Sequence, residues 1–312
     1  MEDEVQYVWA AIQYLQHDRP LSEIADKLGV SRHTAGRMVR RARESGLVEV
    51  VARLSSPIDA ELSRALVERF NLQSALAVLT PPSGNEGQIR HLIAQAAATL
   101  VTELVAEDDV IGLTSGRTIV EMCGLINDVP TCDVVQLTGV AVSDLEQALD
   151  SVMTLSRVAK GRMFPLHAPL LATDENAARI ISRQPAVKQA LHRMNSLNKA
   201  VVTIGGWPQS SLLAAQLEER GELEELTRLG VVAEIGTTLL DEHGRELHTL
   251  DGHLIGISTE QLVRVPTKIA IGGGAGKELA VRAALRAGLV DVLVTDTRTA
   301  RALLDAPSGS AR

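Results

Sequence analysis

The feature that most constrains the fold of this chain is a series of seven short apolar runs in its last three quarters. Most of the runs are continuous rather than alternating, which is typical of strands buried on both faces of a parallel sheet. The runs span residues 75–80, 109–114, 133–139, 199–206, 230–236, 268–274 and 291–296. Helical patterns separate them, as in the apolar stripe over residues 89–105 and the pattern over residues 279–287 that Gly288 closes. Alternating strands and helices predict a doubly wound α/β domain, with ligands at the carboxyl ends of its strands.

The first fifth of the chain has a different pattern, which is clearest in LSEIADKLGVSRHTAGRMVRRARESGLVEV. After a first helix around residues 5–15, the apolar spacing predicts a second helix over residues 21–28 that stops at Gly29. Ser31 then caps a third helix that Gly46 ends, and residues 47–53 alternate like a short strand, or wing. A helix, a glycine turn and a Ser-capped basic helix predict a helix-turn-helix domain, whose second helix lies in the major groove of DNA.

The charge distribution supports DNA binding by this part of the chain, although the whole protein has a net charge of -8. Residues 1–53 carry eight basic and eight acidic side chains, and the stretch from Arg32 to Arg43 holds five arginines and no acid. Arginine offers a bidentate fork to guanine, and an outward row of basic side chains suits phosphate contacts. The candidate DNA-binding residues are Ser22, Ser31, Arg32, His33, Thr34, Arg37, Arg40 and Arg41.

A short Ser/Pro stretch, LSSPID, separates the two patterns and predicts a domain boundary. We therefore expect a helix-turn-helix domain at 1–54, a linker at 55–60 and an effector-binding and oligomerisation domain at 61–312. No apolar run reaches the roughly 18 residues that span a bilayer, and the acidic start is unlike a secretory signal, so a cytoplasmic location is expected. Cys123 and Cys132 are too few for a disulfide framework and are expected to be buried apolar side chains without a functional role.

The loop GLTSGRTIVEM, which leaves one strand and enters a helix, predicts a binding site for a phosphate group. A helix N-terminus offers free backbone N–H groups and a partial positive charge, and Gly116 allows an anion to approach the chain. The hydroxyl groups and the guanidinium of Arg117 add donors across residues 114–118. The alternative is a plain helix cap followed by a surface arginine.

The glycine-rich segment IGGGAGKE is a second candidate, but it is not a nucleotide-binding P-loop. Only three residues separate Gly272 from Gly276, and Lys277 is followed by Glu278 instead of the Ser or Thr that holds magnesium. Aromatic residues make up 2% of the chain, so it lacks platforms on which a bare sugar or a base would stack. A small polar anion is the expected ligand.

Other chemistries fit the sequence less well. The order Gly112, Thr114, Gly116 resembles a nucleophile elbow, but a branched threonine suits that strained turn poorly, which argues against an esterase. His167, at a strand end, is either a cleft residue or a structural one. Asp241 and His243 are typical of a polar hairpin turn, and the spacing of the histidines predicts no metal site.

The chain resembles the SorC type of bacterial transcriptional regulators, the sugar-binding regulators, over nearly its whole length. The resemblance rests on the helix-turn-helix segment, on GLTSGRT, VVQLTG and LHAP, and most specifically on GGGAGKELAVRAALRAGLVDVLVTDTRTARALL. It implies an effector domain similar in fold to sugar-phosphate isomerases and deaminases, oligomeric assembly, and control by phosphorylated sugars. Two positions depart from the family pattern, since a serine is common where Gly36 stands and an aspartate is frequent where Glu234 stands.

Together the loops and the resemblance predict a DNA-binding regulator that responds to a phosphorylated sugar or polyol and controls carbohydrate catabolism or uptake genes. The expected partners are double-stranded operator DNA, the effector and further copies of the chain in a homodimer or homotetramer; no catalytic role, cofactor or membrane contact is expected. The effector-binding candidates are Thr114, Ser115, Gly116, Arg117, Thr118, Gln136, Thr138, Gly139, His167, Glu234, Gly273, Gly274 and Lys277. The alternatives are an enzyme of the isomerase or deaminase kind and a regulator with an unphosphorylated polyol effector, because fold does not decide function.

Overall fold

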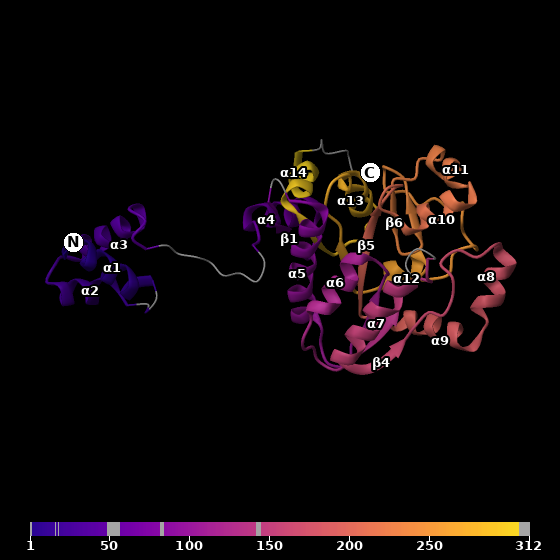
Figure 1. Ribbon diagram of the computed structural model, residues 1–312, viewed down its shortest axis with the longest axis horizontal. Helices are drawn as coiled ribbons and strands as arrows, with labels where there is room; N and C mark the ends of the chain where they lie inside the picture. The colour runs from indigo at the N-terminus through magenta and orange to yellow at the C-terminus, as the bar shows by residue number, and fades with distance from the viewer. Residues whose placement is uncertain are drawn as a thin grey trace. The chain divides into compact units, whose positions relative to one another are not determined.

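The computed structural model describes residues 2–15, 17, 19–48, 57–81, 84–141 and 145–305, and the chain divides into two compact units, Met1–Arg53 and Leu54–Arg312. The smaller unit contains the three helices α1 (Glu2–Leu15), α2 (Leu21–Leu28) and α3 (Arg32–Glu44) (Figure 1). Their inward side chains form one apolar core, made of Ala10, Ala11, Ile24, Ala25, Ala35, Met38, Val39 and Ala42. The strand, or wing, predicted at 47–53 lies from residue 49 onward outside the described residues.

Local hydrogen bonds explain where these helices begin and end. Gly29 follows α2 with a φ of 65°, in the left-handed region that glycine adopts at little cost. The Ser31 hydroxyl accepts a hydrogen bond from the Thr34 amide at 3.1 Å and so caps α3. Ser45, not Gly46, is the C-cap of α3, and Gly46 follows it with a φ of 71°. The helix therefore ends at Glu44, one residue earlier than a C-cap at Gly46 would place its end.

The larger unit is built on a sheet in which seven strands run parallel in the order β1-β9-β8-β5-β2-β3-β4. These strands are β1 (Ser74–Val78), β2 (Val110–Leu113), β3 (Cys132–Gln136), β4 (Lys160–Phe164), β5 (Lys199–Gly206), β8 (Thr267–Ile271) and β9 (Val292–Asp296). Two short strands, β6 (Ala233–Ile235) and β7 (Thr238–Leu240), continue from the end of β5 in antiparallel pairing. The predicted doubly wound α/β fold is confirmed.

Helices cover both faces of the sheet. On one face, α5 (Glu86–Leu104), α6 (Arg117–Leu125) and α7 (Leu145–Ala159) share an apolar core with the strands (Figure 1). The second core joins the strands to α4 (Ala60–Phe70), α8 (Glu175–Ser182), α9 (Pro185–Arg193), α12 (Thr259–Arg264), α13 (Glu278–Arg286) and α14 (Thr297–Asp305). A smaller apolar cluster holds α10 (Leu212–Arg220) and α11 (Leu223–Arg228).

The order of the strands marks the place where a ligand site is expected. From β2 the chain continues to β3 and β4 at one edge, whereas from β5 it continues to β8 and β9 in the opposite direction. The loops that leave neighbouring β2 and β5 therefore diverge, and such a switch point opens a crevice at the carboxyl ends of the strands. Among the described residues, no helix combines the length and the apolar character needed to cross a bilayer.

Candidate functional site

A cavity of about 350 Å³ opens at this switch point, at the carboxyl ends of β2, β5 and β8. Five loops and helix ends form its wall. They contribute residues 114–118, 138–139, 203–205, 209–212, 273–275 and 277, with Glu86, Ile89, Arg90, Ile93, Leu170, Glu234, Gly236 and Ile271 completing it. Eleven of the thirteen predicted effector-binding residues lie in this wall.

The start of α6 presents hydrogen-bond donors to the cavity without a side-chain cap. Gly116 precedes the helix with a φ of 142° and a ψ of 148°, a conformation that side chains other than glycine rarely adopt, and it provides no side-chain cap. The first amide groups of α6 are therefore not capped by a side chain and carry the positive end of the helix dipole. The Ser115 hydroxyl is buried and is among the described side-chain atoms without a hydrogen-bond partner. A buried hydroxyl without a partner, next to an uncapped helix start, offers hydrogen-bonding capacity that a bound ligand can use.

Thr114 lies in the same wall, but its hydroxyl oxygen already accepts a hydrogen bond within the protein. Thr114 Oγ1 accepts a hydrogen bond from the Thr203 amide at 3.0 Å, and Thr203 Oγ1 donates to the Ser115 carbonyl at 3.2 Å. These bonds tie the end of β2 to the end of β5. Thr114 thus positions the loop that carries Ser115 and Arg117.

Lys277 and Glu234 form a second polar region of the cavity wall. Lys277 Nζ donates to the Ile204 carbonyl at 2.9 Å; burial lowers its pKa, as does the charge of Arg117, while the carboxylates of Glu234 and Glu86 oppose the shift. Burial raises the pKa of Glu234, although hydrogen bonds from the Ser211 hydroxyl and the Leu213 amide, and the charge of Lys277, favour its ionised form. A region that combines an amine and a carboxyl group suits the hydroxyl or carbonyl groups of a small polar ligand.

The two predicted glycines after β8 shape the wall through their backbone. A Cβ atom at Gly273 would lie 2.7 Å from Asp296 Oδ2, so only glycine fits there without a shift. The Gly274 amide donates to the same carboxylate oxygen at 2.6 Å and is therefore already engaged. The Lys277 ammonium group, which has three N–H donors and uses one of them on the Ile204 carbonyl, is the side-chain donor that this segment brings to the cavity wall.

Gln136 and His167, which the sequence suggested as effector-binding residues, are not among the residues that line the cavity. The Gln136 side chain is fully buried, where its amide nitrogen donates to the Thr138 carbonyl at 2.9 Å and its oxygen accepts from the Leu166 amide at 3.1 Å. This side chain joins the segment after β3 to the segment after β4. His167 is exposed and lies outside the cavity wall.

Several lining residues were not predicted from the sequence, and two groups of them carry polar side chains. Glu86, Ile89, Arg90 and Ile93 come from the first two turns of α5, where their spacing places them on one helix face. The segment Gln209–Ser211 follows β5, and Ser211 both caps α10 and donates to Glu234. The segment 209–211 could have been predicted from the sequence, since GGWPQSS is a polar, glycine-rich stretch at the end of a predicted strand.

In the smaller unit, most of the predicted DNA-binding residues lie on α3. Arg32, His33, Arg37, Arg40 and Arg41 are exposed, as are Ser22 on α2 and the cap Ser31, while Thr34 is half-buried. The guanidinium of Arg41 lies over the ring of Tyr7 in α1, 5.9 Å from its centroid, so Arg37 is freer to reach DNA. A Cβ atom at Gly36 would lie 3.5 Å from Leu21 Cδ1, an ordinary contact, so packing does not require glycine there.

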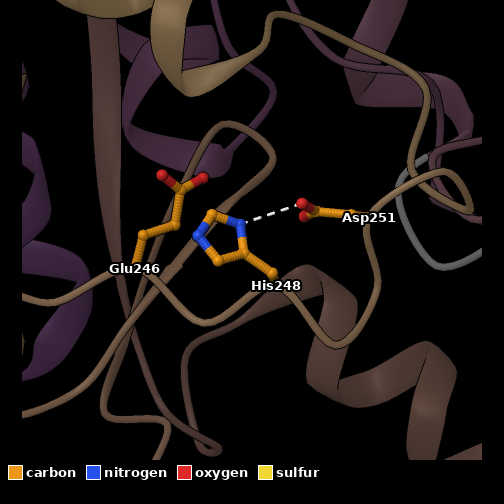
Figure 2. Close-up of side chains that lie close together, drawn as sticks. All are labelled: Glu246, His248 and Asp251. Carbon is orange, nitrogen blue, oxygen red and sulfur yellow. Dashed lines mark hydrogen bonds and ion pairs between the residues drawn. The ribbon is translucent and has the colours of Figure 1, made fainter.

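One group of possible metal ligands lies outside the cavity wall. Glu246, His248 and Asp251 have ligand atoms within 4.8 Å of one another, and His248 Nδ1 lies 2.8 Å from Asp251 Oδ2 (Figure 2). The spacing of the histidines in the sequence did not predict this group. The His248 and Asp251 side chains are 66% and 65% exposed, and Glu246 accepts a hydrogen bond from the Thr259 hydroxyl, so ordinary surface pairing explains the arrangement.

Asp241 lies in the predicted polar turn. Its Oδ1 accepts hydrogen bonds from the His243 and Arg245 amides, both at 2.9 Å, and its Oδ2 accepts one from Arg245 Nε at 2.8 Å. This carboxylate organises the turn after β7, as the hairpin interpretation of the sequence expects.

Residues 58–305 match the family model described as "Putative sugar-binding domain". The chain is similar to the deoxyribonucleoside regulator of Bacillus subtilis (27% identity, 95% of this chain and 96% of the relative). It is also similar to the erythritol catabolism regulatory protein EryD of Brucella abortus (28% identity, 92% of each chain). In fold it is similar to the full-length sorbitol operon regulator SorC from Klebsiella pneumoniae, with a TM-score of 0.72, 23% identity and coverage of 98% of this chain and all of that one.

Proposed function

The chain belongs to the sugar-binding domain family of SorC-type transcriptional regulators, and on that premise we propose that it is a DNA-binding regulator controlled by a phosphorylated sugar or polyol. The smaller unit binds operator DNA through α3, and the cavity of the larger unit binds the effector. The relatives are named for a deoxyribonucleoside and for erythritol, which supports a role in carbohydrate catabolism or uptake.

The observation that carries the phosphate assignment is the buried, unpaired hydroxyl of Ser115 next to the uncapped start of α6. A phosphate oxygen supplies the missing acceptor, and the first amides of the helix and the side chain of Arg117 add further donors. Lys277 and Glu234 then contact the hydroxyl groups of the effector.

A thermal-shift screen with paired ligands tests this function. Each phosphorylated sugar or polyol is compared with its dephosphorylated form, because a ligand that binds only the folded state stabilises it by RT ln(1 + [L]/Kd), about 2.7 kcal/mol at 100 Kd. We expect one phosphorylated compound to raise Tm and to change operator affinity in a gel shift. Equal effects from its dephosphorylated form would instead assign the site to a bare polyol.

An isomerase or deaminase activity is the second candidate, and the pKa values at the site favour it. A carboxyl group with a raised pKa near an amine with a lowered pKa is an arrangement that enzymes use for proton transfer. The whole-length similarity to regulators favours binding without turnover. Product analysis after incubation with the ligand from the screen separates the two candidates.

Arg37→Ala is expected to weaken operator binding by about 1–3 kcal/mol if Arg37 contacts a base, with relaxed specificity at one base pair. The side chain is exposed on α3 and makes no contact that the helical core needs, so circular dichroism is expected to stay unchanged. Gel shifts on the operator and on single-base variants measure both effects. Arg264→Ala, at an exposed position of the larger unit, is the matched control. Undiminished operator affinity in Arg37→Ala would remove this residue from the interface.

The operator is expected to be a near-palindrome bound by a two-fold symmetric dimer or by a tetramer built from dimers. One small helix-turn-helix domain offers a single recognition helix, so two copies are needed to read two half-sites about one helical turn, or a multiple of it, apart. Light scattering of the protein with and without operator DNA measures the stoichiometry. A monomer bound to one half-site would contradict this assembly.

A further inference from the structure

The α5 helix brings an arginine into the cavity wall that the phosphate-binding loop does not supply. Arg90 is half-buried and lies one turn after Glu86 on the helix face that lines the cavity. Its Nε lies 3.4 Å from Glu121 Oε2 in α6, while the other oxygen of Glu121 pairs with His91 Nδ1 at 2.7 Å. Among the described residues, neither terminal nitrogen of Arg90 has a hydrogen-bond partner. Two donor groups at the cavity wall are thus available.

The position of Arg90 relative to α6 links it to the phosphate site. The α5 and α6 helices pack against each other through a shared apolar core, and the first residue of α6, Arg117, lines the same cavity as Arg90. Glu121 follows Arg117 by four residues and is not part of the wall. Arg90 therefore contacts a carboxylate of α6 with one edge of its guanidinium and belongs to the cavity wall as well.

We propose that Arg90 is a second phosphate-binding arginine, which exchanges part of its contact with Glu121 for the phosphate of the effector. This inference rests on the proposed function, because it assigns a further residue to the same site. Guanidinium groups bind phosphate oxygens through two parallel N–H donors, and the terminal nitrogens of Arg90 are the ones without partners. Two arginines from adjoining helices select a dianionic phosphate ester over a singly charged carboxylate of a sugar acid.

The charges of the wall support this assignment. The cavity wall carries the cations Arg90, Arg117 and Lys277 and the acids Glu86 and Glu234. The basic groups outnumber the acidic ones, and a bound phosphate offsets this excess of positive charge. Glu121 holds Arg90 at the wall when the effector is absent and competes with the phosphate when it is present.

The role of Arg90 is tested by titrating the full-length protein with inorganic phosphate in chloride buffer. Calorimetry measures the Kd for phosphate. We expect Arg90→Gln to raise the Kd for phosphate about tenfold and Arg90→Lys to raise it less, since lysine keeps the charge but loses the planar fork. Arg64→Gln, which removes an arginine paired with Glu68 on α4 outside the cavity, is the control and is expected to leave the Kd within twofold.

Glu121→Gln distinguishes ligand binding from a structural role, because it removes the competing carboxylate and keeps Arg90. Phosphate is expected to bind this variant several-fold more tightly, and the gain is expected to vanish in the double variant with Arg90→Gln. If Arg90 served only to pair with Glu121, both single variants would lower Tm alike and leave the Kd for phosphate unchanged, and the proposal would be overturned.

Arg117→Gln separates failure of this inference from failure of the proposed function. Weaker phosphate binding in Arg117→Gln but not in Arg90→Gln overturns the role of Arg90 and leaves the phosphate site in place. A wild-type protein that binds no inorganic phosphate, and no phosphorylated sugar in the thermal-shift screen, overturns both.

Discussion

Lys277→Met is expected to lower the affinity for the phosphorylated effector by roughly 10–100-fold, while operator affinity without effector stays near that of the wild type. A hydrogen bond to a charged group contributes about 1.5–3 kcal/mol, and each 1.4 kcal/mol changes Kd tenfold. Lys277 lies in the cavity wall, and methionine keeps the length and apolar stem of the side chain without its charge. Calorimetry with the compound from the thermal-shift screen measures the affinity, and gel shifts with and without it measure the response on DNA.

The lower effector affinity of Lys277→Met is expected to weaken the effect of the effector on DNA binding. An effector shifts the DNA-binding equilibrium only through its different affinities for the two states of the protein, typically by about 1–3 kcal/mol. The variant therefore needs a correspondingly higher effector concentration for the same change in DNA affinity. Lys188→Met, at an exposed position on α9, is the matched control. Wild-type effector affinity in Lys277→Met would remove the lysine from the site.

The fold was predictable where the physical signal is local. Strand β5 (Lys199–Gly206) has the predicted bounds because it is central and apolar on both faces. Strand β4 (Lys160–Phe164) was missed, since it is an edge strand in which three of the five side chains are exposed, and its sequence KGRMF has no apolar run. Strand β6 was expected in the parallel sheet and pairs antiparallel with β5, because an apolar run does not encode strand direction.

The candidate site was predictable where a strand leads directly into a helix. The segment 114–118 and Lys277 follow the carboxyl ends of β2 and β8, so topology alone brings them to the same edge of the sheet. Arg90 and Glu86 follow a loop after β1, and only the packing of α5 against α6 turns their face to the cavity. Gln136 also stands at a strand end, but its amide group matches two backbone groups nearby and is used to satisfy them. Chain position therefore predicts that a side chain is near the site, and local hydrogen bonding decides whether it faces the ligand.

Gly139→Ala is expected to destabilise the larger unit by about 3 kcal/mol or more, which corresponds to a fall in Tm of roughly 6–12 °C. A Cβ atom at this position would lie 2.3 Å from the Pro169 carbonyl oxygen, a contact with backbone that no side-chain rotation relieves. The Gly139 amide donates to the Ile255 carbonyl at 2.8 Å, and the next residue, Val140, exchanges backbone hydrogen bonds with Ala168 and Leu170. To make room, the chain must separate these segments and lose some of these bonds, at about 1 kcal/mol each.

Gly124→Ala is the matched control, because the same methyl group is added where nothing lies within 4 Å of it. Gly124 is exposed near the end of α6, and alanine is favoured over glycine in a helix by up to about 1 kcal/mol, so this variant is expected to keep or raise Tm.

Thr138 and Gly139 both line the cavity, so the shift forced by Gly139→Ala also displaces part of the effector site. Calorimetric unfolding and effector titration of the two variants measure both effects. Equal Tm values for the two variants would show that the backbone around Gly139 can shift at little cost in free energy. Close packing under the cavity would then not require the glycine of VVQLTG.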